Sequence, residues 1–333
     1  MFAQALLTWY DYHQRDLPWR GEKDPYKVWV SEIILQQTRV QQGWDYYHRF
    51  IETFPDVRSL AEADEQEVLR VWQGLGYYSR ARHIHHAAKQ IMSDFGGIFP
   101  ARYEDIRTLK GVGDYTAAAI AAFAFGLPHP AVDGNMLRVF SRYFGIREDI
   151  ALPKTRREIT ARATREMKGT DPAKFNQAMM DFGATQCTPA NPDCSVCPLQ
   201  KSCYAHQHDL TDMLPVKIQK IKKRQRYFRL TMYLAHNKTI LEKRVGNDIW
   251  RNMYQFPLQE FPTPPEQGEH YVATIHETLT HQQLQADLYV VPCRRLPKLQ
   301  EHQIFVSLDQ LSQYPMPKIM TIFLKEHLQI TLT

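Results

Sequence analysis

Four of the five cysteines lie in one short stretch, at a spacing that suits a metal site. Cys187 is followed after six residues by Cys194, after two more by Cys197 and after five more by Cys203. The first residues of the chain do not have the charge pattern of a secretory signal, so four close thiols favour metal ligands over disulfides. Zinc sites more often show two Cys-x-x-Cys pairs, and this stretch has one. The spacing therefore favours an iron–sulfur cubane, with zinc or unliganded structural cysteines as the alternatives.

Glu32 is a second candidate for chemistry, because it lies in an apolar segment. If residues 28–35 are helical, three of its neighbours one turn away are Val28, Trp29 and Leu35. Desolvation by such neighbours raises a glutamate pKa from about 4.3 toward about 6, so the group can hold a proton near neutral pH. The segment predicts a general acid. The alternative is a buried glutamate paired with a structural arginine.

Two glycines form a turn in the segment 109–117, within Gly111-Val112-Gly113. Glycine lets backbone N–H groups approach an anion closely, and the helix expected after the turn adds a favourable dipole. A hairpin of this kind can hold a DNA phosphate without reading the base sequence. An ordinary turn between two helices is the alternative.

Asp133 follows Gly113 by twenty residues and lies between the apolar pairs Ala131-Val132 and Met136-Leu137. Such a position is a poor one for a purely solvated carboxylate. It is either an ordinary helix cap or a second carboxylate with a role in chemistry.

The elements that must position these residues change in type near residue 210. Helical periodicity dominates before that point, and the alanine-rich run 116–125 predicts a helix that packs closely on a neighbour. Beyond it, alternation at 230–234 and 284–290 predicts strands, and 316–328 predicts a closing helix. We expect an all-α domain over residues 1–210, a basic linker over 211–228 and a smaller α/β domain over 229–333.

The composition agrees with two globular domains. The chain has 333 residues, of which 44% are apolar and 23% charged. Its longest uncharged apolar run, 117–127, is far shorter than the roughly 20 residues of a membrane span. We therefore expect a soluble intracellular protein.

The net charge of +5 is concentrated in one place. Residues 1–210 carry 25 basic and 25 acidic side chains, whereas seven cations and no acid lie in residues 217–229, among them Lys220 and Arg226. This basic segment is a candidate for nucleic-acid contact, and a solvated linker is the alternative.

Taken together, the hairpin, the downstream aspartate and the four cysteines resemble the endonuclease III superfamily of DNA glycosylases. Within it, the segments 29–38 (WVSEIILQQT), 74–78 (GLGYY) and 132–135 (VDGN) resemble the MutY branch, the adenine DNA glycosylases. The likeness is dense over residues 1–210. It implies a helix-hairpin-helix glycosylase domain with a [4Fe-4S] cluster loop at 187–203. Beyond residue 229 the likeness is looser, carried by 249–257 (IWRNMYQFP), and implies a Nudix-like domain.

The resemblance assigns roles to the candidate catalytic residues. It implies that Glu32 protonates adenine and that Asp133 faces the cationic sugar, with Asn135 and Tyr115 as hydrogen-bonding support. This matches the two-carboxylate chemistry of glycoside cleavage. Bifunctional relatives have a Schiff-base lysine at the position of Tyr115, and a phenol cannot form that imine. We therefore expect a monofunctional enzyme, with Lys110 on the other side of the hairpin.

The resemblance also implies contacts with an extruded base and its partner strand. The implied adenine pocket is Trp19, Arg20 and Asp181; the implied DNA contacts are Gln37, the stacking wedge Tyr77, the hairpin residues, Thr280 and His281. Relatives have a Phe-Ser-His element where this chain has Leu279-Thr280-His281. The missing aromatic side chain predicts weaker discrimination of 8-oxoguanine.

The implied partner is double-stranded DNA with adenine opposite 8-oxoguanine or guanine, bound by a monomer in a base excision repair pathway. The implied location is the cytoplasm of a bacterium, at the nucleoid and not at a membrane. The C-terminal part has no glutamate-rich magnesium motif, so we expect no pyrophosphatase activity. Two alternatives stay open. A bifunctional glycosylase/lyase would need a lysine in place of Tyr115, and a non-catalytic DNA-binding module would leave Glu32 unexplained.

Overall fold

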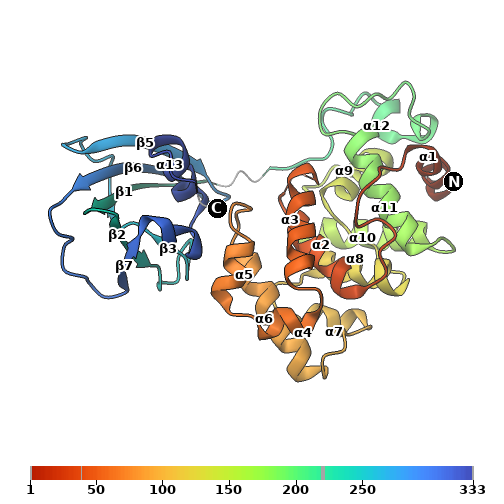
Figure 1. Ribbon diagram of the computed structural model, residues 1–333. Coiled ribbons are helices and arrows are strands. Elements are labelled where there is room, and N and C mark those ends of the chain that lie inside the picture. The colour runs from red at the N-terminus through yellow and green to blue at the C-terminus, as the bar shows by residue number, and fades with distance from the viewer. Residues whose placement is uncertain (1, 39, 219–221, 332–333) are drawn as a thin grey trace. The chain divides into compact units, whose positions relative to one another are not determined.

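The chain begins with helices and changes to strands after residue 223 (Figure 1). The computed structural model describes residues 2–38, 40–218 and 222–331. The helices are α1 Phe2–His13, α2 Pro25–Leu35, α3 Val40–Thr53, α4 Val57–Glu62, α5 Glu65–Val71, α6 Ser79–Asp94, α7 Tyr103–Thr108, α8 Asp114–Phe125, α9 Gly134–Phe144, α10 Pro153–Met167, α11 Pro172–Asp181, α12 Tyr204–Gln207 and α13 Lys318–His327. Shorter helical turns are Phe182–Gln186 (π), Gln200–Ser202 and Leu308–Gln313 (both 3-10).

The strands follow in the C-terminal part of the chain. They are β1 Arg224–Leu234, β2 Lys238–Lys243, β3 Tyr254–Gln255, β4 Leu258–Phe261, β5 Tyr271–Thr278, β6 Gln282–Pro292 and β7 Gln303–Ser307. The described chain divides into two units. The first comprises Met1–Val40, Asp56–Arg58 and Ala87–Gln219, and the second comprises Gln41–Pro55, Ser59–His86 and Lys220–Thr333.

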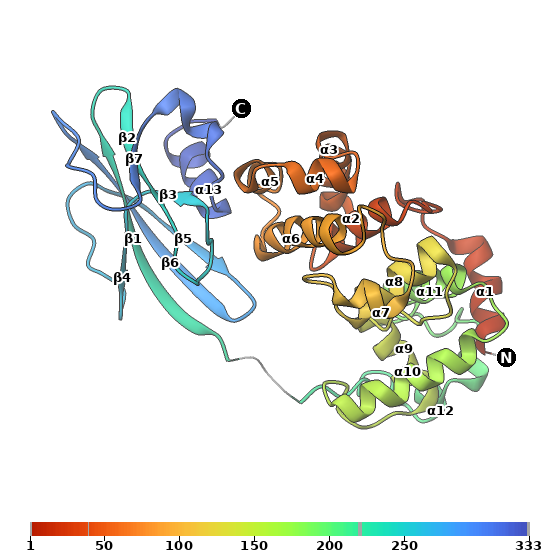
Figure 2. The same cartoon turned by 90° about the horizontal axis from the view of Figure 1, so that it is seen from below.

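Helix α8 forms the centre of the first unit, as its alanine content predicts. Eight consecutive side chains, from Thr116 to Phe123, are buried. Small alanine side chains let neighbouring backbones approach, and α8 packs against α2, α7 and α11. The helix ends at Gly126, whose φ of 66° suits glycine. Figure 2 shows α7 beside α8 and α1 near α11.

The second unit contains two sheets, with strand orders β4-β1-β6-β5 and β3-β2-β7. Strands β1 and β6 pair in parallel, and β5 and β6 pair antiparallel. The predicted strands are confirmed, and the predicted alternation holds in part. Leu230 and Met232 on β1 and Leu284 and Leu288 on β6 are buried, whereas β6 buries four consecutive side chains over residues 286–289. The expected closing helix is α13, which packs on β5 (Figure 1).

Strand β1 begins inside the segment for which the sequence predicts a linker. Arg226 is 5% exposed, and its guanidinium binds the carboxylates of Asp248 and Glu260 at 2.8 and 2.6 Å. Residues 224–228 belong to β1, because the charge of Arg226 is neutralised by carboxylates of the same unit. The prediction that these residues are linker was therefore wrong. Arg226 is also not available for DNA contact. Lys220 lies outside the described residues.

No helix among the described residues is long and apolar enough to cross a membrane.

Candidate active site

A cavity of about 290 Å³ in the first unit contains most of the predicted catalytic residues. Helix α2 contributes Glu32, and the first turn of α8 contributes Tyr115. The residue before α9 contributes Asp133. Other side chains lining this active-site cavity include Arg15, Trp19, Arg20, Gln37, Gln177 and Met180.

Glu32 is a buried acid whose pKa is raised. Its residue is 7% exposed, and the Tyr115 hydroxyl donates a hydrogen bond of 2.8 Å to its Oε2. Burial raises the pKa of Glu32 to about 7, and the nearby charge of Asp133 adds to the rise. The Tyr115 hydrogen bond and the charge of Arg20 act in the opposite direction. The predicted desolvation is confirmed, and no arginine forms an ion pair with Glu32 among the described residues.

Tyr115 is a neutral hydrogen-bond donor at this site. Burial and the neighbouring charges of Glu32 and Asp133 raise the pKa of its phenol well above the usual value. The hydroxyl therefore keeps its proton and can donate to the carboxyl group. The hydroxyl donates to Glu32, whereas the sequence reasoning grouped Tyr115 with Asp133.

Asp133 is the N-cap of α9 and also lines the active-site cavity, so a capping role and a role in chemistry do not exclude each other. As N-cap of α9, its Oδ1 accepts from the Met136 N–H at 2.8 Å. Its Oδ2 accepts from the Asn135 side-chain amide at 2.7 Å. Burial raises the pKa of this carboxyl, and the hydrogen bonds limit that rise. The carboxylate is thus fixed at the cavity by the start of the helix.

Arg138 holds Asn135 in place, and the sequence reasoning missed it. Its Nη2 donates to Asn135 Oδ1 at 2.8 Å and to the Gly183 carbonyl at 2.6 Å. Its Nε donates to the Cys187 carbonyl at 2.8 Å. A signal was available, because Arg138 lies between the apolar Leu137 and Val139 in a segment with helical pattern, as Glu32 does in its own.

Asp181 does not line the cavity itself but forms ion pairs with two arginines that do. It is fully buried, and its carboxylate binds Arg15 at 2.7 Å and Arg20 at 2.5 Å. Arg20 also donates to the hydroxyl of Tyr10. The predicted residues Trp19 and Arg20 line the cavity, and Arg15 joins them without any local pattern that could have indicated it.

Asn176 ties the segment that leads into Asp133 to helix α11. Its side chain is fully buried, accepts from the Ala131 N–H at 2.9 Å and donates to the His129 carbonyl at 3.0 Å. These two bonds satisfy backbone groups that would otherwise be buried without a partner. The contact joins residues 45 and 47 positions apart, so no local sequence pattern could have shown it.

The predicted hairpin joins α7 to α8. Gly111 has a φ of 80°, which favours glycine, and the Val112 N–H donates to the Leu109 carbonyl at 3.0 Å. Gly113 has an ordinary φ of −95°, and no heavy atom lies within 4 Å of where its Cβ would be. The backbone therefore does not require glycine there, and its absent side chain leaves open space at the N-terminus of α8.

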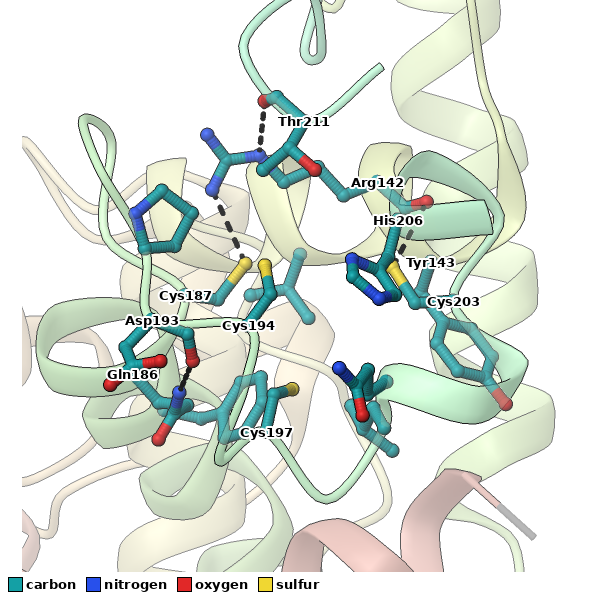
Figure 3. A pocket seen from close by; sticks show the side chains of 15 residues that line it. Arg142, Tyr143, Gln186, Cys187, Asp193, Cys194, Cys197, Cys203, His206 and Thr211 are labelled. Carbon is teal, nitrogen blue, oxygen red and sulfur yellow. Dashed lines mark hydrogen bonds between the residues drawn. The ribbon is translucent and has the colours of Figure 1, made fainter. Parts of the chain in front are cut away.

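The four clustered cysteines line a second cavity in the first unit (Figure 3). All four are free thiols. The buried guanidinium of Arg142 donates to Cys187 Sγ at 3.4 Å and to the Thr188 carbonyl at 2.7 Å. Among the described residues, no three His, Cys, Asp or Glu side chains are grouped so that they could hold a metal ion. The four cysteines therefore share one cavity.

The second unit contains the other predicted DNA contacts. The Thr280 hydroxyl donates to the Tyr77 hydroxyl at 3.1 Å, and the guanidinium of Arg80 lies 5.5 Å from the Tyr77 ring centre. Tyr77 is 41% exposed and has a φ of 49°, which is rare for a bulky residue. His281 is exposed, in the turn that Leu279 closes by donating to the Gln282 carbonyl at 2.8 Å. Gln37, in the first unit, also has a left-handed backbone, with a φ of 57° just after α2 ends.

Comparisons with known proteins agree with this geometry. Residues 30–166 match the HhH-GPD superfamily of base excision DNA repair proteins, and residues 230–326 match the NUDIX domain. The chain is 38% identical over 261 residues to the adenine DNA glycosylase of Buchnera aphidicola subsp. Baizongia pistaciae (strain Bp), covering 77% of this chain and 73% of that protein. It is 42% identical over 215 residues to the adenine DNA glycosylase of Mus musculus, covering 62% and 42%.

Solved structures show the same helical fold. A thermostable thymine-DNA glycosylase superposes with a TM-score of 0.58 at 30% identity, over 62% of this chain and 95% of that one. An endonuclease III bound to DNA superposes with a TM-score of 0.55 at 20% identity, over 63% and 95%. The chain is thus a DNA glycosylase of base excision repair, and it belongs to the adenine DNA glycosylase family within the HhH-GPD superfamily.

Proposed function

We propose that this protein is a monofunctional DNA glycosylase that removes adenine paired with 8-oxoguanine or guanine. The observation that carries the proposal is Glu32, a buried carboxyl group with a pKa of about 7 in a cavity that Asp133 also lines. An acid with this pKa can donate a proton at neutral pH. The names of the relatives supply the base, since they are adenine DNA glycosylases.

In the proposed reaction, Glu32 donates its proton to a ring nitrogen of adenine. The electron pair of the N-glycosidic bond then leaves with the base, and the sugar carbon becomes cationic. Water adds to that carbon and returns a proton to the Glu32 carboxylate. The products are free adenine and an abasic site, and the acid is restored.

Asp133 stabilises the cationic sugar by its charge. Its two oxygens already accept hydrogen bonds from the Met136 N–H and the Asn135 amide, so the carboxylate needs no reorganisation when the positive charge develops. Asn135 is itself fixed by Arg138. This arrangement supports Asp133 as an electrostatic partner and Asn135 as the group that orients it.

Strand cleavage through an imine needs an amine, and Tyr115 has a phenol at this position. Its phenol cannot condense with the abasic sugar, and its role is to donate to Glu32. The Lys110 N–H binds Gln90, and Lys110 does not line the active-site cavity. These observations favour the monofunctional reaction over the lyase alternative.

Adenine reaches Glu32 only after leaving the duplex. We assign Trp19 and Arg20 to the pocket for the extruded base, with Asp181 holding Arg20 by their 2.5 Å ion pair. We assign Tyr77 and Gln37 to the opposite base. Open space at Gly113 supports close approach of a phosphate to the hairpin, with the Gly111, Val112 and Gly113 backbone as the contact.

The cysteine loop 187–203 fits a [4Fe-4S] cluster. Four free thiols surround one cavity, and the Arg142 guanidinium supplies positive charge beside Cys187. Base excision needs no electron transfer, so the bound cluster would supply cross-links among Cys187, Cys194, Cys197 and Cys203. The loop would then present a fixed surface to DNA.

We assign recognition of the lesion strand to the Nudix-like domain, which begins with β1 at Arg224, with Thr280 and His281 as its polar contacts. The glycosylase domain is residues 1–210. The protein acts as a monomer on double-stranded DNA, in the compartment that holds the chromosome. In a bacterium that compartment is the cytoplasm.

The test is an excision assay on labelled duplexes with adenine opposite 8-oxoguanine, guanine or thymine, and with cytosine opposite 8-oxoguanine. The wild type and Glu32→Gln are each incubated, and half of every sample is treated with hot alkali. Breakage at adenine only after alkali, with a rate lowered by about 10²–10⁴-fold in Glu32→Gln, supports the proposal. Gel shift of the variant on the same duplex checks that it still binds DNA.

Two other results would contradict the proposal. Breakage without alkali, in protein free of contaminating nuclease, would show lyase activity. Absence of abasic sites on every duplex, from protein that binds DNA and contains iron, would favour the non-catalytic module.

A further inference from the structure

Helix α10 carries an exposed cationic surface that the proposed reaction does not use. Over residues 153–168 the chain has six basic and two acidic side chains, although residues 1–210 as a whole are neutral. Five of the six basic residues are exposed. Four of the five lie within about 80° of one another around the helix axis, whereas Arg156 lies on the side of the buried Ala163 and Met167. We call these four the basic face of α10: Lys154, Arg157, Arg165 and Lys168.

The two acidic residues of this segment do not neutralise the basic face. Both are half-buried, and the Glu158 carboxylate binds the guanidinium of Arg162 at 2.9 Å. Within the described chain, no carboxylate lies within ion-pair distance of any of the four cations. Lys154 and Arg157, like Arg165 and Lys168, are three positions apart, so like charges are neighbours on the helix surface. Repulsion between these neighbouring cations destabilises the helix, and a bound anionic partner would relieve that repulsion.

The opposite side of α10 anchors the helix in the first unit. Thr155, Ile159, Ala163 and Met167 are buried, and the helix packs on α9 and α1. Figure 2 shows α10 as a long straight helix near α9. None of its residues lines the active-site cavity. The basic face is therefore rigid, and it is separate from the residues assigned to adenine.

The shape of this face suits the backbone of duplex DNA. From Lys154 to Lys168 it extends about 21 Å along the helix, which is about six base pairs of duplex. Its centre carries the small exposed residues Thr160, Ala161 and Thr164, so a straight rod can approach the cations on either side. The face has no aromatic anchor of the kind that dominates protein–protein contacts.

We propose that the basic face of α10 is a second, sequence-independent binding site for the phosphate backbone of duplex DNA. This site holds a DNA segment other than the one whose adenine enters the cavity. The distinction between the two segments rests on the proposed function. Two sites of this kind let the protein pass from one DNA segment to another without being free in solution.

The test is capture of a second duplex by protein that already holds a first one. The protein is saturated with a short unlabelled duplex bearing an uncleavable adenine analogue opposite 8-oxoguanine. A fluorescent, undamaged duplex of thirty base pairs is then titrated in at several salt concentrations and followed by anisotropy. The variants are Arg157→Gln/Arg165→Gln and a control with the same charge change, Arg102→Gln/Lys174→Gln. In the control, both cations already have carboxylate neighbours.

For the wild type we expect a second Kd of about 10⁻⁴–10⁻⁶ M at physiological salt. The Arg157→Gln/Arg165→Gln variant should lower the slope of log K against log salt by about 1.8, which is about 0.9 for each lost phosphate contact. The control should bind like the wild type. Thermal unfolding checks that both variants are folded.

Two results would overturn the proposal: unchanged capture by Arg157→Gln/Arg165→Gln, or displacement of the labelled duplex by polyglutamate more effectively than by competing duplex. The second result would indicate an acidic protein partner. Excision from the short duplex is measured separately and should be unchanged in the variant. If the wild type excises no adenine but still captures the second duplex, the proposed function fails and this inference does not.

Discussion

The chemistry of the candidate site depends on the protonation of one residue. Glu32 is buried beside Asp133 and Tyr115, and its pKa is raised to about 7. In the proposed reaction Glu32 must hold its proton to act as the acid, whereas Asp133 must be ionised to stabilise a cation. Because burial also raises the pKa of Asp133, activity should be confined to a window between the two values.

The first prediction concerns the alkaline side of this window. The single-turnover rate of excision should fall above about pH 7, approaching tenfold per pH unit, as Glu32 loses its proton. Tyr115→Phe removes a hydrogen bond that lowers the pKa of Glu32, so the alkaline limb should move to higher pH. Rates measured from pH 5 to 10 test this. A limb that stays in place or moves to lower pH would show that Tyr115 does not stabilise the Glu32 carboxylate.

The second prediction concerns stability. The pKa of Glu32 is higher in the folded protein than its ordinary value of 4.5, so the free energy of unfolding should fall as pH rises from about 4.5 through 7. The loss is about 3 kcal/mol. Glu32→Gln abolishes it, so this variant should exceed the wild type in stability by about that amount at pH 8. The two proteins should be nearly equal near pH 4. Urea unfolding at both pH values measures the difference, and an equal difference at both would contradict the burial argument.

At the scale of elements, the site depends on the close contact of α9 with the helical turn after α11. Gly183 lies in that π-helical turn, and a Cβ on it would come within 2.4 Å of the Asn135 Cβ. Its carbonyl accepts from Arg138, which also holds Asn135. The contact therefore fixes Asn135 from two sides.

The third prediction is that Gly183→Ala impairs both stability and excision. The new methyl group must displace Asn135 from its hydrogen bond with Asp133, and overpacking of this kind costs about 1–3 kcal/mol. Gly134→Ala is the matched control, because nothing lies within 4 Å of its added Cβ. Urea unfolding and single-turnover rates measure both effects. Wild-type excision by Gly183→Ala would show that Asn135 does not set the position of Asp133.

Sequence reasoning identified the residues whose own neighbours are unusual. Glu32 is an acid among apolar helical positions, and the spacing of the four cysteines indicates a metal site. The alternation of β1 was predicted too, although its start at Arg224 was not, because the ion pairs of Arg226 are formed with residues 22 and 34 positions away.

The supporting residues could not be predicted in the same way. Arg15 and Asn176 act on groups 166 and 45 to 47 positions away, and neither lies in a distinctive local pattern. Their roles follow from which helices pack together. Only the fold brings α11 against both the Trp19 loop and the segment before Asp133.

At the scale of the whole molecule, the cysteine loop is joined to α9 by two buried arginines. Arg138 binds the Cys187 carbonyl, and Arg142 binds the carbonyls of Thr188 and Pro189. Order in the loop therefore stabilises α9, the helix that Asp133 caps.

The fourth prediction is that loss of one cysteine ligand destabilises the first unit. Cys203→Ser should lower the iron content and the midpoint of thermal unfolding, because binding of the metal group contributes to folding. Cys293→Ser is the control and should leave both unchanged. Iron, sulfide and zinc analysis alongside calorimetry checks the result. Stoichiometric zinc in place of iron would contradict the cluster assignment.

The fifth prediction concerns the second unit. Thr280→Val removes the hydroxyl that donates to Tyr77 with little change of volume. The ratio of excision from adenine opposite 8-oxoguanine to excision opposite guanine should fall by up to about tenfold, the effect of one hydrogen bond. Leu279→Phe should raise this ratio, because it restores the aromatic residue of the relatives. Equal ratios of the two excision rates in the wild type, Thr280→Val and Leu279→Phe would show that neither position contributes to recognition of the lesion.

Asp133 caps α9 and, in the proposed reaction, also supplies a negative charge, so a mutation at this position can remove one role and keep the other. Asparagine caps helices about as well as aspartate, so Asp133→Asn should preserve the start of α9 while removing the negative charge. The resulting chain would fold, accumulate to normal levels and still sit on mispairs that it cannot process. Under the proposed function, a cell that makes both this variant and the intact protein would contain a competitor for the same sites on DNA.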